Sequence, residues 1–253
     1  MTFEVTADAY GRHMGRFSEP LAGRFADLLQ LRQGRRVLDV GCGPGALTAV
    51  LTEHLEAGAV AAVDMSESFV AAVRTRLPGV DVRRAAAEHL PFDDAEFDVA
   101  AAQLVVHFMT DPVGGLTEMA RVTRPGGLVA ACVWDYGGGR GPLTPFWRAA
   151  RDLDPDVADE SDRAGTRVGQ LAEMFAAAGL RDIQSSELAV TVTYPTFEDW
   201  WEPLTLGVGA TAKYMAGLDD ARQAALRARC AAQLPPPPFE ITGVAWAAVG
   251  VAG

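Results

Sequence analysis

The stretch VLDVGCGPGALT, residues 37–48, places three glycines within five positions, directly after an apolar run that contains the acid Asp39. The apolar run is typical of a short buried strand, and the residues from Ala46 onward have the composition and length of a helix. Glycines between a strand and a helix indicate that the backbone approaches a ligand closely, because a Cβ there would clash. The segment therefore predicts a ligand-binding turn, and the nature of the ligand decides the function.

Strand-like and helix-like segments alternate on both sides of this turn. An amphipathic helix over 17–28 precedes it, because apolar residues recur there every three or four positions, and Gly34 is expected to end that helix. Predicted strands occupy residues 36–40, 60–63, 80–84, 97–106 and 128–134. Predicted helices lie between them, over 46–55, from Ser66 as N-cap to Leu77, and from Asp111-Pro112 to the RPGG stretch at 124–127.

Strands that alternate with helices at this spacing predict right-handed βαβ crossovers. We therefore expect an α/β fold with a doubly wound, Rossmann-like and mostly parallel sheet. After residue 135 the pattern changes to a glycine-rich stretch and an acidic surface excursion that ends near Ser161. A helix over 168–178, a long strand over 183–194, helical segments over 196–234 and a strand over 241–249 follow. The last strand is expected to form an antiparallel C-terminal edge strand, and the helical insertions a cap or lid.

The length of 253 residues and an apolar content of 49% allow one domain with a full core. We predict a single domain over 1–253. Its parts are an N-terminal helical cap at 1–35, a ligand-binding core at 36–135, and a remainder at 136–253 that completes the sheet. Lid insertions are expected at about 137–165 and 196–238 within that remainder.

The balance of charge limits the partners. With 22 Lys and Arg against 33 Asp and Glu, the net charge of −11 disfavours nucleic acid and anionic membrane surfaces. No apolar run approaches the roughly 18 residues of a membrane span, and the first residues do not resemble a leader. We expect a cytoplasmic protein with a small-molecule substrate, no nucleic-acid or membrane partner, and a monomeric or homodimeric state.

Metal chemistry is not expected. The three cysteines, Cys42, Cys132 and Cys230, are far apart and form no CxxC pair, so neither a zinc site nor a disulfide framework is indicated. No carboxylate cluster follows the fourth strand before Asp111, which is better used as a helix cap.

Two ligand classes compete for the glycine turn. A nicotinamide or flavin dinucleotide is marked by GxGxxG, whereas this turn reads GxGxG with Pro44 before the last glycine. Asp39 is a poor neighbour for a diphosphate but a good one for an ammonium group. Asp64 ends the second strand about 20 residues after the turn, where either cofactor could place its ribose hydroxyls. The spacing and Asp39 favour S-adenosylmethionine (SAM), which carries an amino group and a sulfonium and has no phosphate.

Four ordered motifs carry a resemblance to a known family. VLDVGCGPG, VAAVDMS, AAAEHLPFDDAEFDVA and RVTRPGG together resemble the class I SAM-dependent methyltransferases of the UbiE-like, or methyltransferase 11, type, over about residues 10–135. The resemblance implies SAM as cofactor and S-adenosylhomocysteine as product. One position departs from the family pattern, since Ala86 stands where members often have an acid that accepts from the adenine amine.

The resemblance also implies a set of cofactor-binding residues. The turn residues would cradle the methionine and ribose, Asp64 would bind the ribose, and Met65 would pack on the adenine. Ala87 and Glu88 would lie at the adenine edge and Gln103 at the methionine end, while the segment YGRHMGRFSEPLA would close over the cofactor. The full set is Tyr10, Met14, Arg16, Asp39, Gly41, Cys42, Gly43, Gly45, Asp64, Met65, Ala87, Glu88 and Gln103.

The candidate catalytic residue is His107, just past the fourth strand, because an imidazole can remove a proton from a hydroxyl or carbon acid. A histidine after an apolar strand can equally be a packed structural residue. The aromatics expected around the substrate, with lid packing as the other interpretation, are Trp134, Tyr136, Phe146, Trp147, Tyr194, Trp200 and Trp201.

The sequence favours a SAM-dependent methyltransferase that acts on a small organic acceptor, such as an aromatic or quinone-like ring or a secondary metabolite. A protein that binds SAM or S-adenosylhomocysteine without transferring methyl is the alternative, either as a regulatory partner or as a non-methylating SAM-using enzyme. A nicotinamide oxidoreductase is disfavoured by the glycine spacing and by Asp39.

Overall fold

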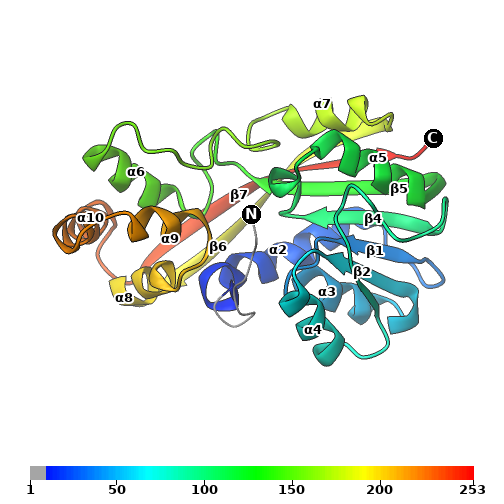
Figure 1. Cartoon of the computed structure of the whole chain (residues 1–253), viewed down its shortest axis with the longest axis horizontal. Coiled ribbons are helices and arrows are strands. Elements are labelled where there is room, and N and C mark those ends of the chain that lie inside the picture. Colours follow the sequence, from blue (N-terminus) through cyan, green and yellow to red (C-terminus); the bar gives the residue numbers. More distant parts are fainter. Residues whose placement is uncertain (1–9) are drawn as a thin grey trace.

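The computed structural model describes residues 10–253. The first nine residues of the predicted N-terminal cap lie outside the described residues. The described chain builds one seven-stranded sheet in the order β3-β2-β1-β4-β5-β7-β6, with helices on both faces (Figure 1). Strand order reverses direction at β1, where one connection leads toward β2 and another toward β4. Ligands in open α/β sheets bind at such a point, beyond the carboxyl ends of the strands.

Five parallel strands form the first part of the sheet and two further strands complete it. The strands are β1 (Val37–Val40), β2 (Val60–Asp64), β3 (Asp81–Arg84), β4 (Phe97–Gln103), β5 (Thr123–Trp134), β6 (Arg181–Tyr194) and β7 (Phe239–Val251). Strand β7 pairs antiparallel with both β5 and β6. The predicted fold class, a mostly parallel sheet with an antiparallel C-terminal edge, is confirmed. Within that edge β7 lies one place inside, and β6 is outermost.

The helices are short and follow the strands closely. They are α2 (Arg16–Ala26), α3 (Ala46–His54), α4 (Glu67–Arg76), α5 (Pro112–Val122), α6 (Thr144–Leu153), α7 (Gln170–Ala177), α8 (Phe197–Trp201), α9 (Gly209–Ala216) and α10 (Asp220–Gln233). Single turns complete the set, at η1 (Gly11–Gly15), η2 (Asp27–Leu29), η3 (Ala57–Ala59), η4 (Val106–Phe108) and η5 (Glu202–Thr205).

Alternating side chains of the central strands divide the core between two faces. Val37 of β1 packs into the cluster that includes α2 and α3, whereas Leu38 and Val40 pack into the cluster that includes α5 and α7. Because side chains of a strand point alternately to opposite faces, a strand covered on both sides must be apolar at nearly every position. Asp39 is the exception in β1, and it is buried.

Two predicted boundaries are wrong, and backbone conformation explains both. The first helix ends well before Gly34, since α2 stops at Ala26 and Gln30 has φ 50°, in the left-handed region. The fourth strand ends at Gln103 because Leu104 has φ 61°, which interrupts the extended run. The residues after it turn as η4 and rejoin the sheet through α5.

The fifth strand begins earlier than predicted. Thr123 already pairs with Phe97 of β4, and regular pairing resumes at Leu128 opposite Val99. The intervening RPGG residues form an irregularity inside β5 rather than a loop before it, which is the role that a bulge plays in a sheet.

Helix α6 lies where the sequence predicts an acidic surface excursion, so that prediction is wrong for residues 144–153. Phe146, Trp147 and Ala150 are buried along one side of α6. That spacing is typical of an amphipathic helix. The apolar residues precede the acidic stretch in the sequence, so this part of the segment does carry a helix signal. The ring of Phe146 lies 5.1 Å from that of Trp147 and 6.3 Å from that of Tyr214 on α9, which joins α6 to the helices inserted between β6 and β7.

The last two strands project beyond the parallel part of the sheet. Strand β7 pairs with β5 only as far as Ala245, opposite Trp134, but pairs with β6 as far as Phe239, opposite Tyr194. The projecting ribbon carries α8, α9 and α10 at its end (Figure 1). Within residues 10–253, no helix combines the length and apolar character needed to cross a lipid bilayer.

Replacing Phe146 by Ala tests whether α6 is part of the core. Because Phe146 is fully buried against aromatic neighbours on two other elements, we expect Phe146→Ala to lower the free energy of unfolding by about 3–5 kcal/mol. Urea unfolding measures the change. The control is Arg148→Ala on the same helix, an exposed position where we expect less than about 0.5 kcal/mol. Equal effects of the two variants would contradict the packing described.

Candidate functional site

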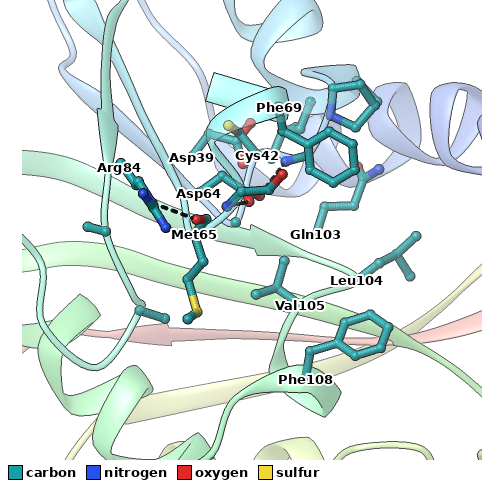
Figure 2. Close-up of a pocket in the computed structure, with 18 of the residues that line it drawn as sticks. Asp39, Cys42, Asp64, Met65, Phe69, Arg84, Gln103, Leu104, Val105 and Phe108 are labelled. Atoms are coloured by element: carbon teal, nitrogen blue, oxygen red, sulfur yellow. Dashed lines mark hydrogen bonds between the residues drawn. The ribbon is translucent and has the colours of Figure 1, made fainter. Parts of the chain in front are cut away.

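A cavity of about 680 Å³ opens at the carboxyl ends of β1, β2 and β4. Figure 2 shows Asp39, Cys42 and Asp64 gathered at one end of it, with Val105 and Phe108 further along. A volume in this range is typical of sites for cofactors and small molecules. The cavity therefore lies where the strand order predicts a ligand.

The glycine turn after β1 is fastened to the end of β2 by its own amide groups. The N–H groups of Gly41 and Cys42 both donate to the carbonyl of Val63, at 2.8 and 2.9 Å, and Gly43 donates to Asp64 Oδ2 at 2.9 Å. Gly45 donates to the carbonyl of Cys42 at 2.9 Å, and Pro44 has no N–H. Every amide donor from 41 to 45 is thus engaged within the protein.

The turn requires glycine for conformation and for space. Gly41, Gly43 and Gly45 have φ of 70°, 52° and 88°, in the region that L side chains rarely adopt. A Cβ on Gly41 would also lie 2.4 Å from a methyl carbon of Val105, so the residue lets the turn approach the β4 connection. At Gly43 the space is open, and an added Cβ would occupy it instead of a ligand.

Asp64 is held rigidly at the end of β2. Its Oδ2 accepts from Gly43 and its Oδ1 accepts from the Ser66 N–H at 2.8 Å. Burial raises the pKa of the carboxyl, while these backbone hydrogen bonds oppose the shift. Each carboxylate oxygen has a second lone-pair direction, so Asp64 can still accept hydrogen bonds from two adjacent hydroxyl groups in the cavity.

Asp39 lies at the same end of the cavity and is 1% exposed. Thr48 Oγ1 on α3 donates to Asp39 Oδ2 at 2.6 Å, and burial raises the pKa of the carboxyl to about 7. A carboxylate desolvated to this degree gains most from a positively charged neighbour, because the charge that burial disfavours is then compensated.

Charge in the cavity is unbalanced. Four carboxylates line it within the described residues, namely Asp39, Asp64, Glu67 and Glu88, against the single guanidinium of Arg84. Arg84 Nε donates to the carbonyl of Met65 at 3.0 Å (Figure 2). The lining favours a cationic ligand over an anionic one.

The structure brings most of the predicted cofactor-binding residues to this cavity. Its lining includes Tyr10, Asp39, Gly41, Cys42, Gly43, Asp64, Met65, Ala87, Glu88 and Gln103. The Met65 side chain is 65% exposed, as expected of an apolar residue available to a flat ring. Glu88 Oε1 accepts from the N–H groups of Thr110 and Asp111, at 2.8 and 3.3 Å, so the residue also connects two loops.

The other four predicted residues do not line the cavity. Met14 and Arg16 lie beside Tyr194 and Trp200, and the Arg16 guanidinium carbon is 5.5 Å from the centre of the Tyr194 ring. Gly45 caps α3, where its carbonyl accepts from Arg76 at 2.6 Å. The roles predicted for these residues stay predictions.

His107 is buried in η4 and is the fourth of these residues. Its ring packs 3.9 Å from that of Phe108, and its Nδ1 has no hydrogen-bond partner among the described residues. Burial, and secondarily the charge of Arg163, lowers the pKa of His107 to about 3. The imidazole is therefore neutral at physiological pH and a weak base in this state of the protein.

Several lining residues were not predicted from the sequence. Phe69 on α4 lies edge-on to Tyr10 at 5.6 Å between ring centres, and Val105 and Phe108 follow β4. Val105 and Phe108 could have been predicted from their position just after the carboxyl end of a strand, because that edge of the sheet faces the ligand. Phe69 gave no separate signal, since its spacing in α4 is that of a core residue.

The aromatics proposed for the substrate instead pack on one another. Trp134, Tyr136, Phe146, Trp147, Tyr194, Trp200 and Trp201 all belong to the core on the α2 side of the sheet, and none of them lines the cavity. Lid-to-core packing, the other interpretation of these residues, is what the structure contains.

Within the part of the chain that the structure describes, no three His, Cys, Asp or Glu side chains gather as they would around a metal ion. A family model described as "Methyltransferase domain" matches residues 38–131, which span the turn, Asp64 and β4.

Similar proteins include enzymes that act on different substrates. The malonyl-[acyl-carrier protein] O-methyltransferase of Erwinia billingiae is 35% identical over 130 residues, which cover 50% of this chain and 49% of that protein. The chain spans about half the length of the curated relatives it matches.

Two solved structures share the fold. An N-methyltransferase of Haemonchus contortus, in complex with S-adenosylhomocysteine, has a TM-score of 0.58 at 18% identity, covering 97% of this chain and 56% of that chain. The [4+2]-cyclase SpnF has a TM-score of 0.53 at 22% identity, covering 92% of this chain and 80% of that chain.

The chain shares its fold with class I SAM-dependent methyltransferases. Residues 38–131 are its methyltransferase domain, of the type described as methyltransferase 11. The cofactor that belongs to this class is SAM.

The raised pKa of Asp39 predicts a change in stability with pH. The carboxyl titrates near 3.8 when unfolded and near 7 when folded, so the folded state binds more protons between these values, and stability falls as the pH rises through that window. Asp39→Asn abolishes this dependence. As the pH rises from 5 to 8, we expect the free energy of unfolding of the variant to increase by about 1–3 kcal/mol relative to that of the unchanged protein.

Urea unfolding of both proteins, without ligand, measures this difference. Thr48→Val serves as the comparison, because it removes the hydrogen bond that opposes the pKa shift of Asp39 and should extend the pH dependence to higher pH. Parallel pH profiles for all three proteins would show that Asp39 does not titrate in this range.

Proposed function

We propose that this chain transfers a methyl group from SAM to a small organic acceptor, with an aromatic, quinone-like or secondary-metabolite acceptor favoured. The observation that carries the proposal is the engagement of the amide donors of the glycine turn. Gly41, Cys42 and Gly43 donate to Val63 and Asp64, which leaves the turn no free amide from 41 to 45 with which to hold a diphosphate. Dinucleotide sites depend on such amides.

The charges around the turn support the same cofactor. An amino group or a sulfonium is cationic, and Asp39 and Asp64 lie at the end of the cavity where the turn is. Open space beside Gly43 leaves room for the ligand, and Asp64 can accept both ribose hydroxyls. The residues present thus fit SAM, with Met65 exposed for the adenine and Gln103 at the opposite wall.

SAM supplies a methyl group already activated by its sulfonium, so alignment of the acceptor contributes much of the rate. This chain would provide that alignment by holding the cofactor at Asp64 and the turn. The lining after β4, at Leu104, Val105 and Phe108, is apolar and would exclude water from the acceptor side. His107, with its low pKa, is not favoured as the base in the ligand-free state.

A SAM-using protein without methyl transfer is the second candidate. It is supported by the likeness in fold to SpnF, which is named as a cyclase, and by the absence of histidine and lysine from the residues that line the cavity in the described part of the chain. The two candidates share the cofactor and differ only in whether a methyl group is transferred to an acceptor.

Calorimetry tests the cofactor. S-adenosylhomocysteine is expected to bind and NADH to give no heat. Asp64→Asn should weaken the binding of S-adenosylhomocysteine by about 1–3 kcal/mol, roughly 5- to 150-fold in Kd, because the ribose hydroxyls lose their charged acceptor. Asp220→Asn, an exposed acid at the start of α10, is the matched control and should bind unchanged. Binding of NADH alone would overturn the proposal.

Turnover separates the two candidates. Incubation with methyl-labelled SAM and a panel of phenols, quinones and amines should transfer label to at least one class of acceptor. The product S-adenosylhomocysteine should form in equal amount. Binding of S-adenosylhomocysteine without transfer to any acceptor in the panel would favour the non-methylating alternative.

A further inference from the structure

One buried polar atom in the wall of the cavity has no partner. Several buried side-chain nitrogen and oxygen atoms lack a hydrogen bond within the described residues, but among them only Oε1 of Gln103 belongs to a residue that lines the cavity. Gln103 ends β4 and is 9% exposed (Figure 2). A buried polar group without a partner is costly, so native structures keep few of them. A ligand in the cavity can supply the missing donor.

The nitrogen of the same amide is already engaged. Gln103 Nε2 donates to the carbonyl of Ser18 at 2.9 Å, across 85 residues of sequence. Ser18 is on α2, is 4% exposed and also lines the cavity. Because a carbonyl can only accept, this hydrogen bond fixes which end of the amide is the nitrogen and leaves Oε1 as an unused acceptor. Gln103 thus joins the sheet to α2.

The backbone around Gln103 is fixed by the neighbouring strand. Gln103 pairs with Cys132 in the parallel ladder between β4 and β5. Leu104, the next residue, has φ 61° and donates its N–H to the carbonyl of Cys132 at 2.8 Å. The side chain of Gln103 cannot leave the cavity wall by rotation of the backbone unless this pairing with β5 is broken.

The register of the sheet places Gln103 close to Asp39. Asp39 of β1 pairs with Ala101 of β4, and Gln103 follows Ala101 by two residues. Because side chains two apart on a strand share a face, these three residues point to the side of the sheet covered by α2 and α3. Gln103 is roughly 6–7 Å farther along the strand direction than Ala101. A charged acceptor and a neutral one therefore lie on adjacent strands at the cavity.

Two neighbouring acceptors select a group that only donates. Within the described residues, the Asp39 carboxylate accepts one side-chain hydrogen bond, from Thr48, and Gln103 Oε1 accepts none. An ammonium group has three donors and no lone pair, so it can donate to both and compensate the buried carboxylate. A carboxylate or a phosphate would be repelled by the same pair. SAM carries such an ammonium group, and S-adenosylhomocysteine retains it.

We propose that Gln103 links cofactor binding to α2: its Oε1 accepts a hydrogen bond from the ammonium group of the cofactor, beside Asp39, while its Nε2 holds the carbonyl of Ser18. Hydrogen bonds in a chain polarise one another, so a bond accepted at Oε1 strengthens the bond donated by Nε2. Binding of the ammonium group thus stabilises the contact between β4 and α2. The inference rests on the proposed function, since it concerns the same cofactor, and it requires no chemical step.

Two ligands that differ in the amino acid part test this link in the unchanged protein. S-adenosylhomocysteine has the ammonium group, whereas 5′-methylthioadenosine keeps the adenosine and the sulfur but lacks the amino acid. Hydrogen exchange is measured by mass spectrometry with each ligand at saturation. Both ligands should slow amide exchange in the turn after β1. Only S-adenosylhomocysteine should slow it in α2, by roughly 3- to 10-fold.

Calorimetry on a variant assigns the effect to Gln103. Gln103→Leu removes both polar ends of the amide with little change in volume. It should weaken the binding of S-adenosylhomocysteine, and of its decarboxylated analogue that keeps the ammonium group, by roughly 5- to 50-fold. Binding of 5′-methylthioadenosine should change by less than about 2-fold. S-adenosylhomocysteine at saturation should no longer slow exchange in α2 of this variant.

The matched control is Gln223→Leu. Gln223 on α10 donates from Nε2 to the carbonyls of Met215 and Leu218, at 3.2 and 3.1 Å, so it makes the same kind of connection away from the residues that line the cavity. This variant should bind all three ligands as the unchanged protein does. Exchange in α2 should also respond to S-adenosylhomocysteine as before.

The outcomes separate this inference from the function beneath it. If the unchanged protein binds none of the three ligands, the proposed function and this inference both fail. If it binds them, but Gln103→Leu keeps its affinity for S-adenosylhomocysteine or loses affinity for 5′-methylthioadenosine equally, the inference alone is overturned. Protection of α2 by 5′-methylthioadenosine in the unchanged protein also overturns it, and this result does not depend on whether a variant folds.

Discussion

The site depends on the hydrogen bonds that join the turn after β1 to the end of β2. The carbonyl of Val63 accepts hydrogen bonds from two amide groups of the turn, and the Asp64 carboxylate accepts one from a third. These bonds fix the turn in a left-handed conformation that only glycine adopts readily, and they fix the Asp64 carboxylate in the same step. The consequence is chemical as well as structural, because a turn whose donors are already engaged presents acids to a ligand and not amides.

Most of the sheet and this turn could be predicted from the sequence because their signals are local. Apolar runs of four to seven residues, a glycine turn and an acid at the end of β2 each need only their own neighbours to be interpreted. The antiparallel position of the last strand was also predictable. Its place inside β6 was not, since pairing partners far apart in the chain leave no local mark.

The elements packed around α6 were harder to predict, for a physical reason. Helix α6 lies between a glycine-rich stretch and an acidic stretch. The composition of these flanking stretches is typical of a loop, which made the apolar spacing of Phe146, Trp147 and Ala150 hard to recognise. Glu160 lies in that same acidic stretch, and only its tertiary contacts distinguish it from exposed neighbours such as Asp162. Likewise, Met14 and Arg16 follow the cavity residue Tyr10 closely in the sequence, but in the structure they lie beside Tyr194.

The projecting ribbon of β6 and β7 keeps the helices at its tip apart from the strands whose ends form the cavity. Its pairing extends without interruption from Gln184 to Tyr194, so the register of the sheet is complete before the chain enters the helices at its tip. Those helices can therefore be exchanged or lengthened while the strands that hold the cofactor pocket keep their positions. In a fold arranged in this way, one group of helices at the end of a hairpin can be replaced without rebuilding the sheet.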